Sequence, residues 1–148
     1  YTSLFTGDLN EPLGKLLTGN PIFSADFYKA PHHGVTGVAP NSFSNTVEPT
    51  LMMVPQPKHL QTHPRGLQYY NWSQKKASST GMITCTNGVN GTVKLSFKYT
   101  SVLVSPEREG GGCRNVELTF KGKSVVSLKP KTVNLSPIID LLLIEAET

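Results

Sequence analysis

The stretch Phe27-Tyr28-Lys29-Ala30-Pro31-His32-His33-Gly34 (FYKAPHHG) joins a short apolar run to a proline, two histidines and a glycine. The apolar part predicts a buried strand over residues 26–30 that delivers the paired histidines. An earlier apolar run, residues 1–8, ends in a similar way on Gly7-Asp8. We therefore expect an oxygen ligand and nitrogen ligands at neighbouring strand ends, which is how proteins commonly build a metal site.

Outward from this stretch the sequence predicts alternating strands and helices. The predicted strands cover residues 1–8, 26–30, 50–54, 82–86 and 92–99, and the predicted helices cover residues 11–17 and 65–76. Residues 34–44 and the segment with His59 and His63 are expected to be loops, and residues 87–91 a turn. Beyond residue 99 we expect short strands at 102–104, 116–120 and 124–128, the last two joined by a hairpin at 121–123.

Composition sets limits on the class of protein. A chain of 148 residues with 37% hydrophobic and 16% charged residues is one globular domain in length. Eleven prolines and thirteen glycines favour short strands joined by turns, so we expect more strand than helix. The net charge is +4, and the lysines are scattered through the second half, which fits a solvated basic surface or a nucleic-acid or phosphate-facing patch.

Several features suggest an extracellular or secreted protein. N-glycosylation sequons begin at Asn71, Asn90 and Asn134, and Cys85 and Cys113 belong to no C-x-x-C pair, which leaves room for one disulfide. No apolar run reaches 18 residues, so the sequence predicts no membrane span. No signal peptide is visible, and a start inside a strand without an initiator Met suggests processing or fragmentation.

The order of several motifs resembles the C-terminal half of a metallo-β-lactamase-fold hydrolase. The motifs are Thr6-Gly7-Asp8, then Asp26-x-x-Lys29-x-Pro31-His32-His33-Gly34, then His63-Pro64, then a strand from Thr84 with Gly88 and Gly91. The branch it looks most similar to contains DNA-uptake competence proteins and phosphorylcholine esterases. The resemblance covers residues 1–97 and implies an α/β fold, an αββα half with a mixed sheet and few short helices. Residues 98–148 would be an added β-rich segment.

The resemblance implies a role for each matching residue. Asp8 would bridge two metal ions, and His33 would bind the second metal. His32 would face the substrate phosphate or the bridging water, and Asp8 and His32 would be the catalytic residues. His63 would contact substrate at the mouth of the site. The implied cofactor is two zinc ions, although manganese or iron also suit a mixed His/carboxylate set, and the implied reaction is phosphodiester hydrolysis by metal-activated water.

Each of these residues also has an ordinary structural interpretation. Asp8 is also suited to cap the helix that follows or to close an Asx-turn, and paired histidines are common in polar loops. A His-Pro dipeptide also occurs in ordinary loops. Trp72, with its neighbours Tyr69 and Tyr70, is expected to pack the helix that carries it, and the alternative is an aromatic cage for a cation.

The departures from the family pattern are as informative as the matches. The family's H-x-H-x-D-H motif, which supplies most metal ligands, is missing from these 148 residues. We therefore expect no catalytic metal in this chain alone and a partner chain or fragment that carries this motif. The alternatives are a non-catalytic binding or structural module that retains half of the fold, and a secreted β-rich adhesion-type domain.

Overall fold

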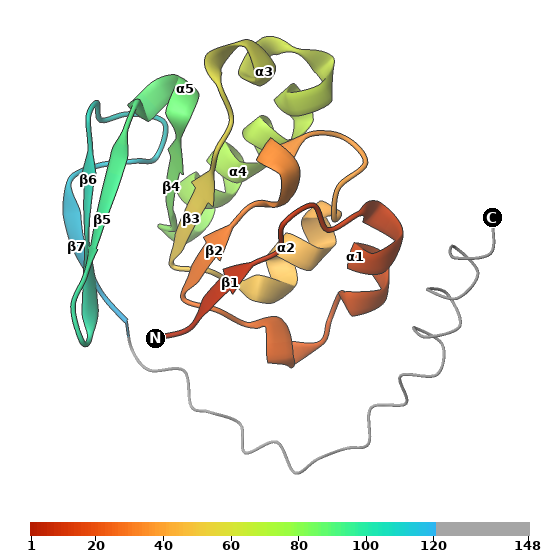
Figure 1. The fold of residues 1–148 in the computed structure, drawn as a ribbon, viewed down its shortest axis with the longest axis horizontal. Coiled ribbons are helices and arrows are strands. Elements are labelled where there is room, and N and C mark those ends of the chain that lie inside the picture. Colours follow the sequence, from red (N-terminus) through yellow and green to blue (C-terminus); the bar gives the residue numbers. More distant parts are fainter. Residues whose placement is uncertain (121–148) are drawn as a thin grey trace.

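The computed structural model describes residues 1–120, which form two β-sheets and a set of covering helices (Figure 1). The predicted hairpin at 121–123, the strand at 124–128 and the sequon at Asn134 lie outside the described residues. The fold is α/β: a four-stranded parallel sheet with interleaved helices, followed by a three-stranded antiparallel segment.

The parallel sheet has the order β1-β2-β3-β4, from β1 (Ser3–Phe5), β2 (Phe27–Lys29), β3 (Leu51–Val54) and β4 (Ile83–Thr86). Each strand pairs with the next one in the chain. Right-handed crossovers that all advance in one direction place their helices on one face of a sheet. Because all four strands are parallel, their carboxyl ends meet at one edge of the sheet, toward α3 and α5 (Figure 1).

The helices fill the connections between these strands. They are α1 (Glu11–Leu17), η1 (Pro21–Phe23), η2 (Pro31–Gly34), α2 (Asn41–Val47), α3 (Lys58–Thr62), α4 (Pro64–Thr80) and α5 (Asn87–Asn90). Helix α1 begins at the Asn10 cap, whose side-chain oxygen accepts a hydrogen bond from the Leu13 N–H at 3.1 Å. Helix α4 ends at Gly81, which has a left-handed φ of 75°.

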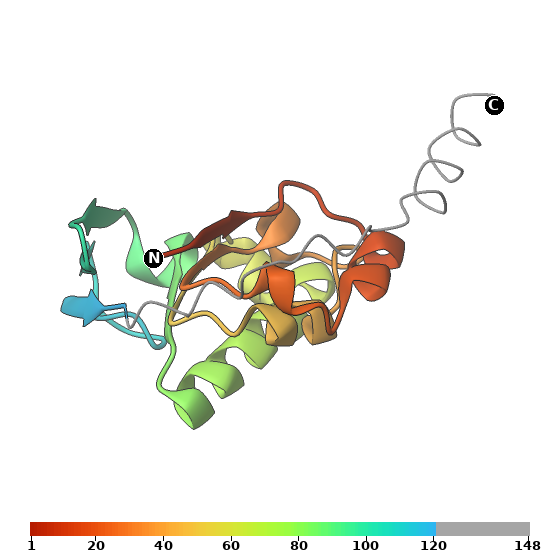
Figure 2. The same cartoon turned by 90° about the horizontal axis from the view of Figure 1, so that it is seen from below.

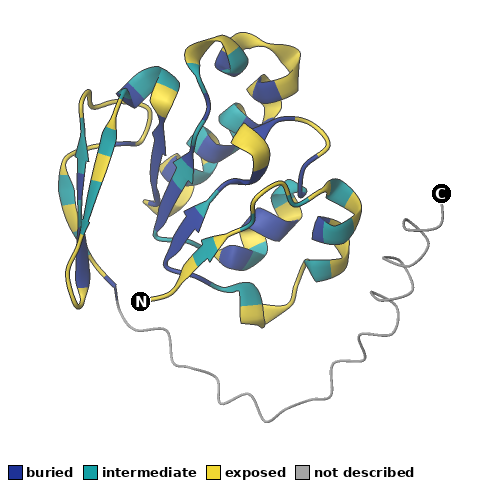
Figure 3. Cartoon of the chain, in the orientation of Figure 1, coloured by how far each residue is buried: buried dark blue, intermediate teal, exposed yellow. Residues whose placement is uncertain are grey.

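A buried apolar cluster joins the helices to one face of the parallel sheet. Tyr28 and Met52 from the sheet pack with Phe43 and Val47 of α2 and with Tyr69 of α4. Figure 2 shows α2 and α4 together on one side of the sheet. Burial is greatest in β2, β3 and β4, whereas β1 at the sheet edge is largely exposed (Figure 3).

The other face of the parallel sheet packs against the antiparallel sheet, which contains β5 (Val93–Phe97), β6 (Ser101–Pro106) and β7 (Val116–Thr119). Leu51 and Ile83 from one sheet are buried with Val102 and Val104 from the other. Cys85 in β4 and Cys113, which lies between β6 and β7, form a disulfide within this second cluster. The sequence left this pairing open.

Several expectations need correction. More of the described residues lie in helices than in strands, and the interleaved helices contradict a β-rich adhesion-type domain. The predicted loop at 34–44 contains the start of α2, and the predicted loop around His59 contains α3. The proposed boundary between residues 97 and 98 falls inside the three-stranded sheet, where it would separate the paired strands β5 and β6.

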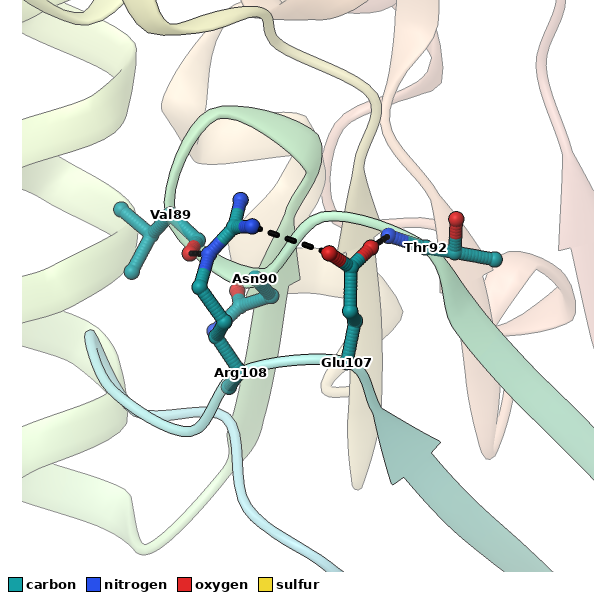
Figure 4. A network of polar contacts seen from close by, with 5 residues as sticks. All are labelled: Val89, Asn90, Thr92, Glu107 and Arg108. Atoms are coloured by element: carbon teal, nitrogen blue, oxygen red, sulfur yellow. Dashed lines mark hydrogen bonds and ion pairs between the residues drawn. The ribbon is translucent and has the colours of Figure 1, made fainter.

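The turn expected at 87–91 is the one-turn helix α5, and a polar network ties it to the loop after β6 (Figure 4). The Glu107 carboxylate accepts hydrogen bonds from the Thr92 N–H and from the Arg108 guanidinium, both at 3.0 Å. Arg108 also donates to the Val89 carbonyl at 3.1 Å. These contacts hold the antiparallel sheet onto the end of β4.

Candidate carboxyl-edge site

The candidate site lies where β1 and β2 end, because both strands deliver their polar residues to the carboxyl edge of the sheet. Ligand sites in parallel sheets occur at this edge. The Gly7-Asp8 turn follows β1, and the His32-His33 pair lies in η2 directly after β2. The His32 backbone N–H donates to the Gly7 carbonyl at 3.0 Å, so the two strand ends that sequence reasoning expected to be neighbours lie side by side.

Both histidines have an uncommon backbone conformation. The φ angle is 37° at His32 and 59° at His33, and Gly34 follows with a φ of 65°. Non-glycine residues rarely adopt positive φ, and each such residue costs about 1–2 kcal/mol in conformational free energy. Strain of this kind persists only where surrounding contacts enforce it, and it clusters at functional sites.

The neighbouring strand β3 enforces this conformation through the two residues that follow it. His33 Nδ1 lies 2.6 Å from the Pro55 carbonyl oxygen, a distance at which the ring N–H donates to the carbonyl. The adjacent Gln56 side chain is fully buried, and its amide Nε2 donates to the Gly34 carbonyl at 3.3 Å and to the Gly66 carbonyl at 3.1 Å. Together these contacts fix the histidine turn from one side and the start of α4 from the other.

Gly34 is required where it lies. A Cβ at this position would come within 2.6 Å of the Tyr69 ring, and the left-handed φ disfavours any other residue. The close approach of the turn to α4 therefore needs glycine. The third residue of the H-H-G motif thus has a packing role, which is separate from the roles expected for the two histidines.

The four expected site residues are all exposed, but their surroundings differ. Asp8, His32 and His33 gather around the ends of β1 and β2. The Asp8 carboxylate has no hydrogen bond or ion pair within residues 1–120, and Asn10, not Asp8, caps α1. The interpretation of Asp8 as a helix cap is therefore wrong.

His63 has a structural role that the sequence did not indicate. Its Nδ1 accepts a hydrogen bond from the Arg65 N–H at 3.2 Å, so the ring caps the first turn of α4. With Nδ1 as an acceptor the proton of the neutral ring lies on Nε2, so in this arrangement neither nitrogen has a free lone pair for a metal. Contact with a substrate remains a prediction for this residue.

A histidine whose Nδ1–H donates to a backbone carbonyl has its Nε2 free and oriented, which is the usual arrangement of a metal-binding histidine. His33 satisfies this requirement through Pro55, and Asp8 offers an uncommitted carboxylate. Across the described part of the chain, however, no three His, Cys, Asp or Glu side chains are grouped to hold an ion. The donors present therefore fit part of a metal site, and further ligands would have to come from elsewhere.

Sequence reasoning missed Gln56, which follows β3 and bonds both the histidine turn and the start of α4. The signal was a polar residue between two prolines, immediately after the buried strand Leu51–Val54. A polar side chain at that place is expected to satisfy backbone groups of the neighbouring strand ends, because buried polar groups are nearly always hydrogen-bonded.

The sequons have different environments. Asn71 is exposed on α4, whereas Asn90 is 1% exposed and its amide donates to the Arg108 carbonyl at 3.0 Å and to the Gly110 carbonyl at 2.9 Å. Its Oδ1 also accepts from the Thr86 N–H at 2.8 Å. A glycan on Asn90 would have to displace these bonds, whereas one on Asn71 would project from a helix surface.

Comparison with known proteins adds no assignment: no protein-family model, curated protein or solved structure matches this chain. Within residues 1–120, no helix is both long and apolar enough to cross a membrane.

Proposed function

We propose that this chain is the C-terminal portion of a metal-dependent hydrolase, a phosphodiesterase, that is completed by a segment or partner chain carrying an H-x-H-x-D-H motif. One observation carries the proposal: the consecutive left-handed histidines beside the Gly7-Asp8 turn, with the His33 ring oriented by the Pro55 carbonyl. Strain at two adjacent residues has no folding benefit, so a chemical role accounts for it best.

The roles of the residues follow from their donors. Asp8 and His33 would hold the metal, zinc or alternatively manganese or iron, through a carboxylate oxygen and Nε2. A bound pair of such ions supplies Lewis acidity and an activated water for hydrolysis. His32, exposed beside His33 with ring centroids 5.9 Å apart, would donate a hydrogen bond to a phosphoryl oxygen and stabilise its charge.

An uncovered apolar region on the parallel sheet supports the need for a completing segment. Phe5 lies on the same face as Phe27, with ring centroids 5.5 Å apart, yet Phe5 is 64% exposed and Phe27 only 4%. Tyr1 and Phe97 extend this apolar region, which we call the Phe5 face, and their rings stack at 5.4 Å. The antiparallel sheet covers the part of the sheet near β3 and β4 and leaves the part near β1 open.

The Cys85–Cys113 disulfide is consistent with an oxidising compartment, and together with the exposed sequon at Asn71 it supports a secreted or extracellular location. Mass spectrometry of native material would show the disulfide and the glycan on the same chain. A fully reduced, unglycosylated native protein would contradict this location.

The decisive test uses the chain together with its copurifying polypeptides. Hydrolysis of bis(p-nitrophenyl) phosphate and metal content are measured for the wild type, for Asp8→Ala and for the control Glu109→Ala, a carboxylate outside the site. We expect Asp8→Ala to abolish activity and lower metal content together, while the control retains both. Full activity in Asp8→Ala would refute the proposal, and a metal-free, inactive native assembly would favour the binding-module alternative.

A further inference from the structure

A separate pocket of about 300 Å³ opens at the opposite edge of the parallel sheet, where β3 and β4 begin. Its walls come from α2, α4 and the residues that lead into the two strands, and they include Ser44, Glu48, Trp72, Lys76 and Met82. A pocket of this size with an apolar wall and a few polar groups has the general form of a small-molecule site.

Trp72 forms the aromatic wall and is held in place by its neighbour. Its ring packs against the Tyr69 ring, with centroids 5.3 Å apart, and Trp72 remains partly exposed on the pocket side. An indole that is held by a neighbouring ring and lines a pocket offers an apolar surface at little entropic cost. Met82 adds a second apolar surface to the same pocket.

A buried hydroxyl cluster lies behind this wall. The Ser44 hydroxyl is 3.0 Å from the Tyr69 hydroxyl and donates to the Tyr28 hydroxyl at 3.4 Å. Burial raises the pKa of the Tyr69 phenol well above its ordinary value, so the cluster stays neutral across the physiological range. Ser44 lines the pocket, and its hydroxyl is held within this neutral cluster.

Lys76 provides the charge that selects a ligand. Its side chain is half-buried at the pocket, and no acidic side chain of residues 1–120 forms an ion pair with its ammonium. Glu48 lines the same pocket from a left-handed position with a φ of 50°.

We propose that this pocket binds a small apolar carboxylate, with its apolar group against Trp72 and Met82 and its carboxylate at the Lys76 ammonium. This inference is independent of the proposed hydrolase, because none of its residues belongs to the carboxyl-edge site. The site would serve as a ligand or effector site at the amino edge of the sheet.

The test uses Trp72 as the reporter, since it is the only tryptophan in the 148 residues. The full chain is titrated with 3-phenylpropionate and, separately, with phenethylamine, which has the same ring and the opposite charge. We expect saturable change of the Trp72 fluorescence with 3-phenylpropionate and affinity at least about fivefold weaker for phenethylamine.

Two matched lysine variants show whether Lys76 is the anion-binding group. Lys76→Met is expected to weaken 3-phenylpropionate binding about fivefold, whereas Lys75→Met, on the exposed side of the same helix, leaves it unchanged. Far-UV circular dichroism confirms that both variants are folded. No fluorescence change at millimolar ligand, tighter binding of phenethylamine or equal effects of the two variants would overturn the proposal.

Discussion

His32 and His33 both have a left-handed backbone conformation, which lowers the stability of the fold while it places two imidazoles at the candidate site. Glycine adopts this conformation without steric cost, so replacing a strained residue should stabilise the fold even though glycine adds entropy to the unfolded chain. His32 is the suitable position, because its side chain makes no hydrogen bond within the described residues, whereas His33 donates to Pro55.

His32→Gly is expected to raise the free energy of unfolding by up to about 1 kcal/mol. His63→Gly serves as the control, because His63 has an ordinary φ of −81° and caps α4, so its loss should be destabilising. Urea unfolding of the three proteins gives both values. A destabilised His32→Gly would mean that the imidazole contributes packing that outweighs its backbone strain.

The buried tyrosines predict an alkaline limit of stability. Burial raises the pKa of Tyr69 well above 10, and it raises that of Tyr28 as well. A phenol with a raised pKa in the folded state contributes stability that is fully present below its unfolded pKa and is lost as the pH rises through the folded value. The free energy of unfolding should therefore fall above about pH 10.

Tyr69→Phe removes one of these phenols, so its free energy of unfolding should decline less steeply above about pH 10 than that of the wild type. Tyr99→Phe is the control, because the Tyr99 side chain is 96% exposed and lies outside the buried hydroxyl cluster. Urea unfolding across this pH range compares the slopes. Identical slopes for Tyr69→Phe and the wild type would contradict the prediction.

At the residue scale, the sequence predicted the neighbourhood of Asp8, His32 and His33 and missed what holds it. Motif order places residues after strands, and parallel strands bring their ends to one edge, so the neighbourhood follows from local information. The Gln56 amide bonds and the capping role of His63 depend on tertiary contacts with α4, which no local pattern encodes.

At the element scale, the strands and helices with regular apolar spacing were predicted from the sequence. Helix α2, which is mostly polar, was not predicted. The predicted strands at 50–54 and 82–86 match β3 and β4, and the predicted helix at 11–17 matches α1. Helix α2 reads Asn-Ser-Phe-Ser-Asn-Thr-Val, in which weak helix formers surround a single apolar pair four residues apart. Helix α2 is therefore stabilised by the burial of Phe43 and Val47 in the core and not by the helix propensity of its residues.

The disulfide is a further feature at the element scale, because it links the two sheets. Cys85 in β4 and Cys113 are 28 residues apart and both are buried in the cluster between the sheets. Closing a loop of this length limits the unfolded chain, so the Cys85→Ser/Cys113→Ser variant should lose about 3–4 kcal/mol in the free energy of unfolding. Urea unfolding with and without reductant measures this loss.

The reductant supplies the control for that experiment. It should destabilise the wild type by a similar amount and leave the double variant unchanged, because the variant has no remaining cysteine. Insensitivity of the wild type to reductant under unfolding conditions would show that the two thiols are not joined.

At the scale of the whole molecule, the Phe5 face is an exposed apolar surface within the described residues. Exposed apolar patches mark interaction sites, and here the patch continues a sheet face that is buried further along. The chain alone should therefore self-associate at high concentration. Phe5→Lys is expected to suppress this association, as measured by sedimentation velocity.

Leu16→Lys provides the matched control, because Leu16 on α1 is 62% exposed, close to the 64% of Phe5, and lies outside the Phe5 face. Association that persists unchanged in Phe5→Lys, or that falls equally in both variants, would show that this face is not the contact surface.

The strand order of the parallel sheet also has a consequence during protein synthesis. Because β1, β2, β3 and β4 lie in the sheet in the order in which the ribosome produces them, each new strand can add to an edge that already exists. Cys113 emerges only after that sheet is complete. Oxidation would then link a finished sheet to its second layer, because Cys113 is the one other thiol within these 148 residues.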